Sequence, residues 1–146
     1  MAAVLDGQAG TLASVWSGGH LNAPVPATQL RVLFVVERYG SINVTGVATE
    51  LGALLSSASR LCGRLEATGL LERVPGPDRR AITLRLTPRG ADLLADLRRV
   101  RRGALAEVLA GMDTDDRAAL RLGLERFHEA VVRQRGEAPL GFSMPA

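Results

Sequence analysis

Two short segments with a helical spacing of apolar residues follow each other between residues 43 and 68, and only a three-residue turn separates them. In each segment apolar side chains recur at i, i+3, i+4 and i+7, which places them on one face of an α-helix. The first set is Val44, Val47, Ala48 and Leu51, and the second is Ala58, Leu61, Cys62 and Leu65. Asn43 is a good N-cap for the first helix, and Gly52 ends it. Two such helices joined by a tight turn with a glycine predict a helix-turn-helix.

The periodicity changes from helical to alternating after Gly69. Residues 71–74 suit one strand, and residues 81–86 suit a second strand that places three apolar side chains on one side, Ile82, Leu84 and Leu86. The segment between the strands is rich in proline and glycine, as turns are. Its tip carries Asp78, Arg79 and Arg80. A β-hairpin directly after a helix-turn-helix is a wing, so we predict a winged helix-turn-helix.

A further helix is expected before this pair. Thr28 is a suitable N-cap, and the apolar pattern that follows it stops at Gly40. The next two residues, Ser41-Ile42, could pair as a short extended segment. The expected fold class is therefore mainly α with a small β-wing.

Long helical patterns flank the winged region. Thr87-Pro88 places a cap and an N1 proline in the favoured order and opens a helix that runs to about residue 112. The acidic residues 113–116 break this helix and suit the start of another. These helices and residues 1–22 carry wide apolar faces that the compact region 28–87 leaves largely uncovered. Because burial of apolar surface is favourable, we expect a second copy of the chain to cover them in a homodimer, or the helices to fold onto the first one.

Composition excludes several classes of protein. The longest purely apolar run, residues 32–36, is far shorter than the ~20 residues of a membrane span, and we recognise no signal peptide at the N-terminus. The single cysteine, Cys62, excludes an internal disulfide, and His20 and His128 lie too far apart for a metal-binding motif. No triad, paired-carboxylate or phosphate-binding glycine motif emerges. We expect a cytoplasmic protein that is not an enzyme, contacts no membrane and needs no metal or cofactor.

The basic residues of the chain are all arginine. Arginine stays protonated at high pH, so the isoelectric point near 10.3 overstates a formal net charge of only +3. The positions of the arginines are therefore more informative than their number.

The second helix of the helix-turn-helix has a polar face that could read DNA. Its members are Ser56, Ser57, Ser59, Arg60 and Arg64. An α-helix fits the major groove, where small serines allow close approach and arginine can bond guanine O6 and N7. The alternative is that these residues only form the solvated side of an amphipathic helix.

The tip of the wing is the second candidate contact with DNA. Arg79 and Arg80 suit a narrow minor groove, whose negative potential attracts guanidinium groups. Asp78 repels phosphate, so we expect it to orient an arginine through a bidentate pair. The alternative is an ordinary charged turn. The densest run of charge, residues 98–102, lies inside the long helix and is more typical of a solvated helix face.

The order and spacing of five motifs are similar to those of the multiple-antibiotic-resistance regulator (MarR) family. These motifs are Gln29-Leu30-Arg31-Val32-Leu33, Val47-Ala48-Thr49-Glu50-Leu51, residues 64–73, Asp78-Arg79-Arg80 and Leu86-Thr87-Pro88-Arg89-Gly90. Together they cover about residues 28 to 135. The resemblance implies a dimer that binds pseudo-palindromic double-stranded DNA, usually as a repressor, and that a small, often phenolic or anionic aromatic, effector releases. It also implies that Arg80 is the partner of Asp78.

The resemblance divides the chain by function. Together with the apolar faces of the flanking helices and the two prolines of the last segment, it leads us to expect one domain over residues 1–146, with a DNA-binding core at 28–90, dimerisation helices at 1–22 and 91–135, and a flexible tail at 136–146. One departure concerns the start of the recognition helix, where the family often has Ser-Pro and this chain has Leu54-Leu55.

Two further sets of residues have competing interpretations. Four residues could line an effector pocket or could belong to the core: Trp16, His20, Phe34 and Tyr39. Cys62 lies on the apolar face of its helix, so it is either a buried structural residue or the sensor of a thiol-redox response. Apart from a DNA-binding regulator, the alternative function is a winged-helix module that binds proteins and not DNA.

Overall fold

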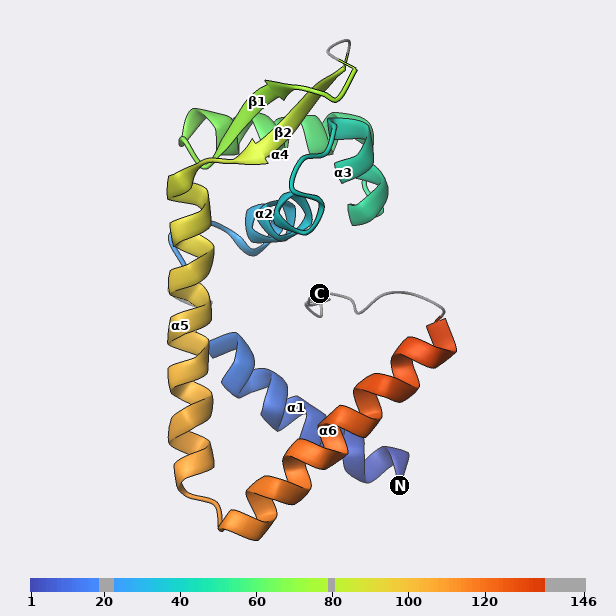
Figure 1. Cartoon of the computed structure of the whole chain (residues 1–146), viewed down its shortest axis with the longest axis vertical. Coiled ribbons are helices and arrows are strands. Elements are labelled where there is room, and N and C mark those ends of the chain that lie inside the picture. Colours follow the sequence, from blue (N-terminus) through green and yellow to red (C-terminus); the bar gives the residue numbers. More distant parts are fainter. Residues whose placement is uncertain (19–22, 79–80, 136–146) are drawn as a thin grey trace. The chain divides into compact units, whose positions relative to one another are not determined.

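The computed structural model describes residues 1–18, 23–78 and 81–135. The helices and strands in chain order are α1 (Ala2–Gly18), α2 (Ala27–Tyr39), α3 (Val44–Leu51), α4 (Leu55–Ala67), β1 (Leu71–Pro75), β2 (Ile82–Leu86), α5 (Pro88–Ala110) and α6 (Thr114–Arg135) (Figure 1). The chain divides into two compact units, Gly19–Val100 and Met1–Gly18 with Arg101–Ala146, and α5 contributes to both. The predicted fold class, mainly helical with a two-stranded wing, is confirmed.

The unit of residues 19–100 is built around one apolar core. Helices α2, α3 and α4, both strands and the first part of α5 contribute to it. The eight apolar positions that predicted α3 and α4 all take part: five are buried, and Val44, Leu51 and Leu61 are partly buried against them. The apolar spacing of both helices therefore matches how they pack in the structure. Because one face of α4 is buried, its opposite face lies in solvent.

The ends of these helices follow from single residues. The Asn43 side chain accepts a hydrogen bond of 2.7 Å from the Gly46 N–H, and Gly52 ends α3 with a φ of 60°. Gly69, with a φ of 72°, ends α4. The prediction of Thr28 as the cap of α2 is wrong, because the helix begins one residue earlier, at Ala27. The Pro26 carbonyl accepts the N–H of Leu30 at 3.0 Å and starts the helix without a side-chain cap.

The wing is an antiparallel hairpin of β1 and β2 with a third short partner. Ile42 and Leu84 exchange backbone hydrogen bonds of 3.1 and 2.8 Å, which confirms the extended pairing expected at Ser41-Ile42. Ile82, predicted on one side of β2 with Leu84 and Leu86, is 58% exposed, whereas Thr83 is buried. Ile82 pairs with Pro75 at the far end of the hairpin.

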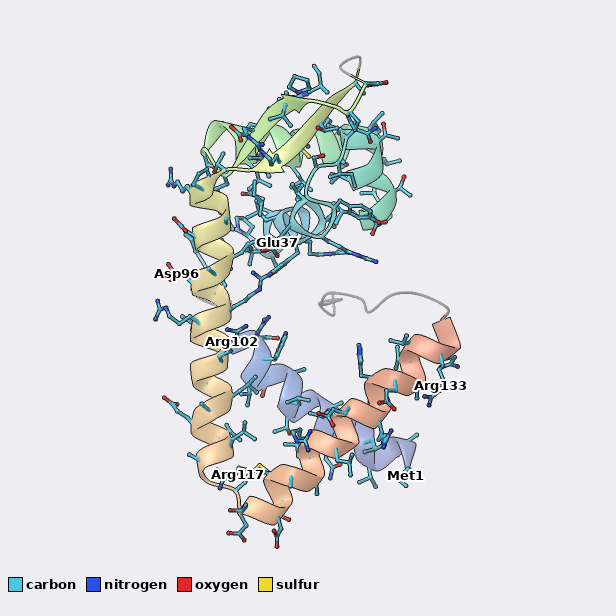
Figure 2. The ribbon with its side chains drawn as sticks, in the orientation of Figure 1. Met1, Glu37, Asp96, Arg102, Arg117 and Arg133 are labelled. Atoms are coloured by element: carbon cyan, nitrogen blue, oxygen red, sulfur yellow. The ribbon has the colours of Figure 1, made fainter. Side chains whose placement is uncertain are left out.

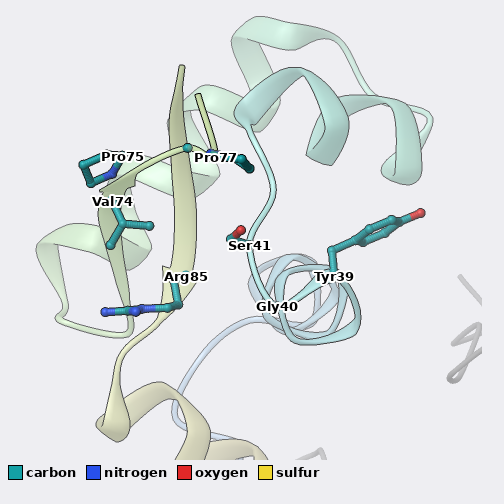
Figure 3. Close-up of a pocket in the computed structure, with 8 residues that line it drawn as sticks. Tyr39, Gly40, Ser41, Val74, Pro75, Pro77 and Arg85 are labelled. Carbon is teal, nitrogen blue, oxygen red and sulfur yellow. The ribbon is translucent and has the colours of Figure 1, made fainter. Parts of the chain in front are cut away.

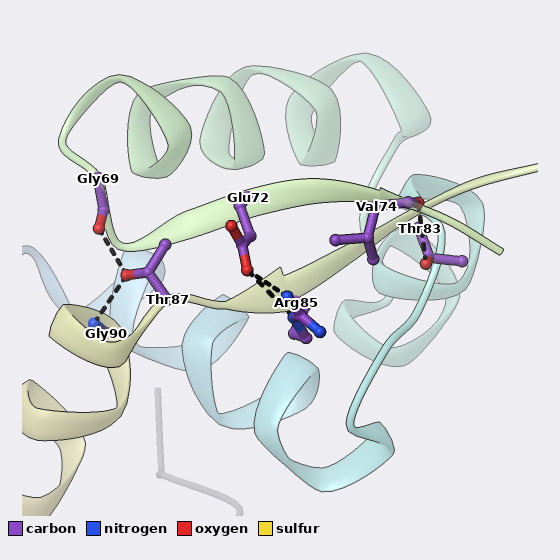
Figure 4. A network of polar contacts seen from close by, with 7 residues as sticks. All are labelled: Gly69, Glu72, Val74, Thr83, Arg85, Thr87 and Gly90. Carbon is purple, nitrogen blue, oxygen red and sulfur yellow. Dashed lines mark hydrogen bonds and ion pairs between the residues drawn. The ribbon is translucent and has the colours of Figure 1, made fainter.

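The base of the wing is tied to the start of α5. The Thr87 hydroxyl donates to the Gly69 carbonyl at 2.6 Å and accepts the Gly90 N–H at 3.1 Å (Figure 4). The expected cap is therefore present, and it also joins the end of α4 to the beginning of α5. Further along the hairpin, Arg85 and Glu72 lie directly opposite each other and form an ion pair of 2.7 Å.

The second unit contains α1, the last part of α5, and α6. Its one well-buried polar side chain among the described residues is Arg101, whose guanidinium lies 3.6 Å from the centre of the Trp16 ring. Large apolar side chains of this unit are exposed, namely Met1, Val4, Leu5, Leu12, Val108, Leu120, Leu122, Leu124 and Phe127. In a single copy of the chain, many of the apolar side chains on which we based the predicted dimer are therefore exposed to solvent.

Candidate nucleic-acid interface

Helix α4 presents a polar face to solvent. Its buried residues are Ala58, Cys62 and Leu65. The five side chains predicted to contact DNA are all exposed, namely Ser56, Ser57, Ser59, Arg60 and Arg64. Because an α-helix turns about 100° per residue, Ser56, Arg60 and Gly63 point most directly away from the buried side. A face of small residues with an arginine at its centre can approach a groove closely.

The charge of this face is positive. Between Glu50 and Glu66 the chain contains two arginines and no acidic residue. Within the described part of the chain, neither Arg60 nor Arg64 lies within ion-pair distance of a carboxylate. The guanidinium groups of α4 are therefore available to phosphate oxygens or base edges.

An ion pair joins the C-terminal end of α4 to the wing. Arg73 on β1 makes two hydrogen bonds to the Glu66 carboxylate, of 2.7 and 3.1 Å. These bonds raise the pKa of the Arg73 guanidinium. Together with the Gly69 turn, this contact joins the recognition helix and the wing, so that both can meet one surface in a fixed relation.

The described part of the wing tip includes Asp78. Its carboxylate accepts the N–H of Ala81 at 3.2 Å, and the Gly76 N–H donates to the Ala81 carbonyl at 2.6 Å. Asp78 therefore helps to shape the turn itself. Arg79 and Arg80 lie outside the described residues, so the expected pairing of Asp78 with Arg80 stays a prediction.

Cys62 is fully buried in the core of the unit. Burial, and next the charge of Glu66, raise the pKa of its thiol, and the opposite influence of Arg73 is smaller. A neutral, inaccessible thiol is a poor nucleophile. This environment supports the structural interpretation of Cys62 over the redox interpretation.

The four residues proposed for an effector pocket have different surroundings. Phe34 packs against the core and lies 6.0 Å from the Arg98 guanidinium, whereas the exposed Tyr39 donates a hydrogen bond of 2.5 Å to Glu50. Trp16 contacts Arg101 in the other unit, and His20 lies outside the described residues. The structure does not bring Phe34 and Tyr39 together, although both belong to α2.

A different hollow lies between the end of α2 and the wing (Figure 3). It is open, with a volume of about 770 Å³, and is lined by Tyr39, Gly40, Ser41, Val74, Pro75, Gly76, Pro77 and Arg85. Among those predicted effector residues that the structure describes, Tyr39 alone borders it. The sequence signal that could have indicated this hollow is the extended pair Ser41-Ile42, because its bridge to Leu84 brings the end of α2 beside the hairpin.

The arginine run of α5 does not form one solvated face. Arg98 bonds both carboxylate oxygens of Glu37 on α2, one of them at 2.9 Å, and these bonds raise its pKa. Figure 2 shows Glu37 on α2 and Asp96 on α5. Arg101 is buried, whereas Arg99 and Arg102 are exposed as expected, and Arg99 forms an exposed ion pair of 3.3 Å with Asp96. Two arginines of the run are thus engaged in internal packing.

Two other features that can indicate a site are absent from the described residues. They contain no cluster of three or more potential metal ligands. In residues 1–18, 23–78 and 81–135, no helix combines the length and the apolar character that crossing a membrane requires.

The helix pair α3–α4, followed by the hairpin and α5, defines a winged helix-turn-helix protein. The sequence model of the MarR family matches residues 23–81, the part that contains α2, the helix pair and β1. The HTH-type transcriptional regulator MT0903.1 of Mycobacterium tuberculosis is 30% identical over 101 residues, 68% of this chain and 71% of that protein. The HTH-type transcriptional regulator YfiV of Bacillus subtilis is 26% identical over 110 residues, 75% of this chain and 69% of that protein.

The crystal structure of RV1404 from Mycobacterium tuberculosis shares the fold, with a TM-score of 0.77 and 28% identity over 88% of this chain and 90% of that one. The chain belongs to the MarR family of transcriptional regulators. The resemblance identified from the motifs is thereby confirmed. The family and the relatives are regulators of transcription and not enzymes, as the sequence led us to expect.

Proposed function

We propose that the chain is a homodimeric, sequence-specific DNA-binding regulator that acts as a repressor in the cytoplasm. Helix α4 enters the major groove with Ser56, Ser57, Ser59, Arg60 and Arg64, and the wing contacts the minor groove through Arg79 and Arg80. The observation that carries this proposal is the exposed, cationic face of α4, which lacks a carboxylate partner within the described residues.

The proposed dimer is supported by the apolar side chains exposed on α1, the last part of α5, and α6. Phe127 is 66% exposed and Val4 64%, which is costly for isolated helices in water. A two-fold symmetric dimer buries such faces with one interface. It also presents two recognition helices to successive major grooves, about 34 Å apart, which matches a pseudo-palindromic operator.

A small aromatic effector completes the proposal. We propose that it contacts residues of the set predicted from the sequence, Trp16, His20, Phe34 and Tyr39, of which Phe34 packs against the core and Tyr39 is exposed at the end of α2. Binding of an anionic aromatic compound would then shift the dimer toward a form with lower affinity for DNA. The test is a panel of aromatic acids added to a preformed protein–DNA complex, with release of the DNA as the measured quantity.

The alternative is a winged-helix module that binds proteins. Surfaces that bind proteins favour an aromatic or otherwise apolar centre, with few charges. The centre of the α4 face consists of Ser56, Arg60 and Gly63, which supports DNA as the partner.

The deciding experiment uses the DNA upstream of the gene for this chain in a gel-shift assay. We expect the purified protein to shift a fragment that contains an inverted repeat. Arg60→Ala and Arg79→Ala should each weaken the shift without loss of fold. Arg117→Ala, which removes an exposed arginine of α6, is the matched control. Failure of the parent protein to shift any fragment would refute the proposal.

A further inference from the structure

We propose that Leu54 and Leu55 recognise thymine by contact with its 5-methyl group in the major groove, so that they determine part of the sequence specificity. This inference rests on the proposed function, because it assumes that α4 enters DNA. It adds an apolar contact to the predicted DNA-binding surface, which so far contained only serines and arginines.

The two leucines are exposed although their unit has a complete core. Leu54 is 76% exposed and Leu55 is 54% exposed. Helix α4 already packs through Ala58, Cys62 and Leu65, with Leu61 partly buried beside them. Leu54 occupies the N-cap position, where its side chain makes no capping hydrogen bond. Leu54 therefore provides no side-chain cap for α4, and its exposed side chain contributes little to the core.

The position of the leucines places them at the end of the helix that reads bases. In helix-turn-helix proteins, residues near the N-terminus of the recognition helix contact base edges. Leu55 is the first residue of α4 and lies one turn before Ser59. Leu55 lies one turn before the buried Ala58 on one side and the exposed Ser59 on the other, so it sits at the edge of the exposed face, at its N-terminal end.

The positive charge around the two leucines favours DNA as the binding partner. The surface that continues from them carries Arg60 and Arg64, and no acidic residue lies between Glu50 and Glu66. An apolar pair embedded in a cationic strip complements DNA, whose phosphates are negative. In the major groove the apolar group that distinguishes one base is the 5-methyl of thymine. Leucine has no hydrogen-bonding group, so contact with this methyl is how it can recognise a base.

The test compares thymine with uracil, which differ by this methyl group alone. The full-length protein is first used to select duplexes from a random pool. Each thymine of the selected half-site is then replaced by uracil, and Kd is measured by fluorescence anisotropy at one salt concentration. We expect at least one replacement in each half-site to weaken binding about fourfold, the value of one buried methyl group.

Protein variants assign this effect to the leucines. In the Leu54→Ala/Leu55→Ala variant the ratio of the two Kd values should fall to about one. Ser56→Ala, which alters the neighbouring residue, should retain the fourfold ratio even if its affinity is lower. Leu55→Met keeps an apolar side chain and should retain the preference, and circular dichroism checks that each variant is folded.

The possible failures are distinct. Tight binding by the parent with no thymine that responds to uracil would overturn the role of the leucines and leave the proposed function in place. A methyl preference that survives in the double variant would do the same. If selection enriches no duplex at all, the proposed function fails and this inference fails with it.

Discussion

Substitution of Thr87 tests how the wing is attached to the helical core. Its hydroxyl donates to the Gly69 carbonyl at 2.6 Å and accepts the Gly90 N–H at 3.1 Å, so it joins the turn after α4 to the first turn of α5. Thr87→Val keeps the shape of the side chain and removes both bonds. Loss of an N-cap costs about 1 kcal/mol, and loss of the bond to a partly buried carbonyl costs about 1 kcal/mol more. We therefore expect the free energy of unfolding to fall by about 2 kcal/mol.

The assay is urea unfolding followed by circular dichroism, with all variants at one protein concentration because the proposed dimer would make stability depend on concentration. The control is Thr49→Val, which removes only the exposed hydrogen bond from Thr49 to the Thr45 carbonyl, 3.1 Å long. We expect the control to stay within about 0.5 kcal/mol of the parent. A Thr87→Val variant as stable as this control would refute the assigned role.

Three further substitutions or measurements test other contacts. Gly90→Ala should destabilise the fold by about 1–3 kcal/mol in the same assay, because an added Cβ would overlap the Leu70 carbonyl oxygen. Unchanged stability would contradict this packing. Arg98→Met should cost up to about 1 kcal/mol in low salt through the lost pair with Glu37, and an undiminished cost in 1 M salt would contradict an electrostatic origin. Cys62 should react with a disulfide reagent only after urea is added, whereas rapid reaction of the native protein would contradict its burial.

The parts of the fold that could be predicted from sequence depend on neighbours along the chain. The two core faces of the helix-turn-helix follow from apolar spacing, and Asn43, Gly52 and Gly69 act within a few residues of their own positions. The same holds for Thr87, whose cap on α5 was expected. Its bond to Gly69, which is distant in the sequence, was not.

The parts that could not be predicted depend on contacts that are distant in the sequence. Arg98 was expected on a solvated face, but it bonds Glu37, which lies 61 residues earlier in the chain. Arg101 is buried through its contact with Trp16, and alternation along β2 could not show that Ile82 is exposed. A periodic pattern shows which residues share a face, but it does not show which of them are covered.

The candidate site was predictable for a related reason. The exposed face of α4 is the complement of its buried face, so the apolar spacing alone located Ser56, Ser59 and Arg60. The exposure of Leu54 and Leu55 was not predictable in this way. Apolar residues at the start of an amphipathic helix are normally expected to extend its core, and here the core ends at Ala58.

The most direct test of the central claim, that α4 holds DNA, is the salt dependence of duplex binding. For the parent protein, log K should fall linearly with log salt concentration, with a slope of about −0.9 for each phosphate neutralised. Arg64→Ala should make this slope shallower by about one for each half-site if Arg64 contacts a phosphate, and Arg117→Ala on α6 should leave it unchanged. Binding that is absent at low salt, or an affinity of the parent protein that does not change with salt concentration, would contradict the account.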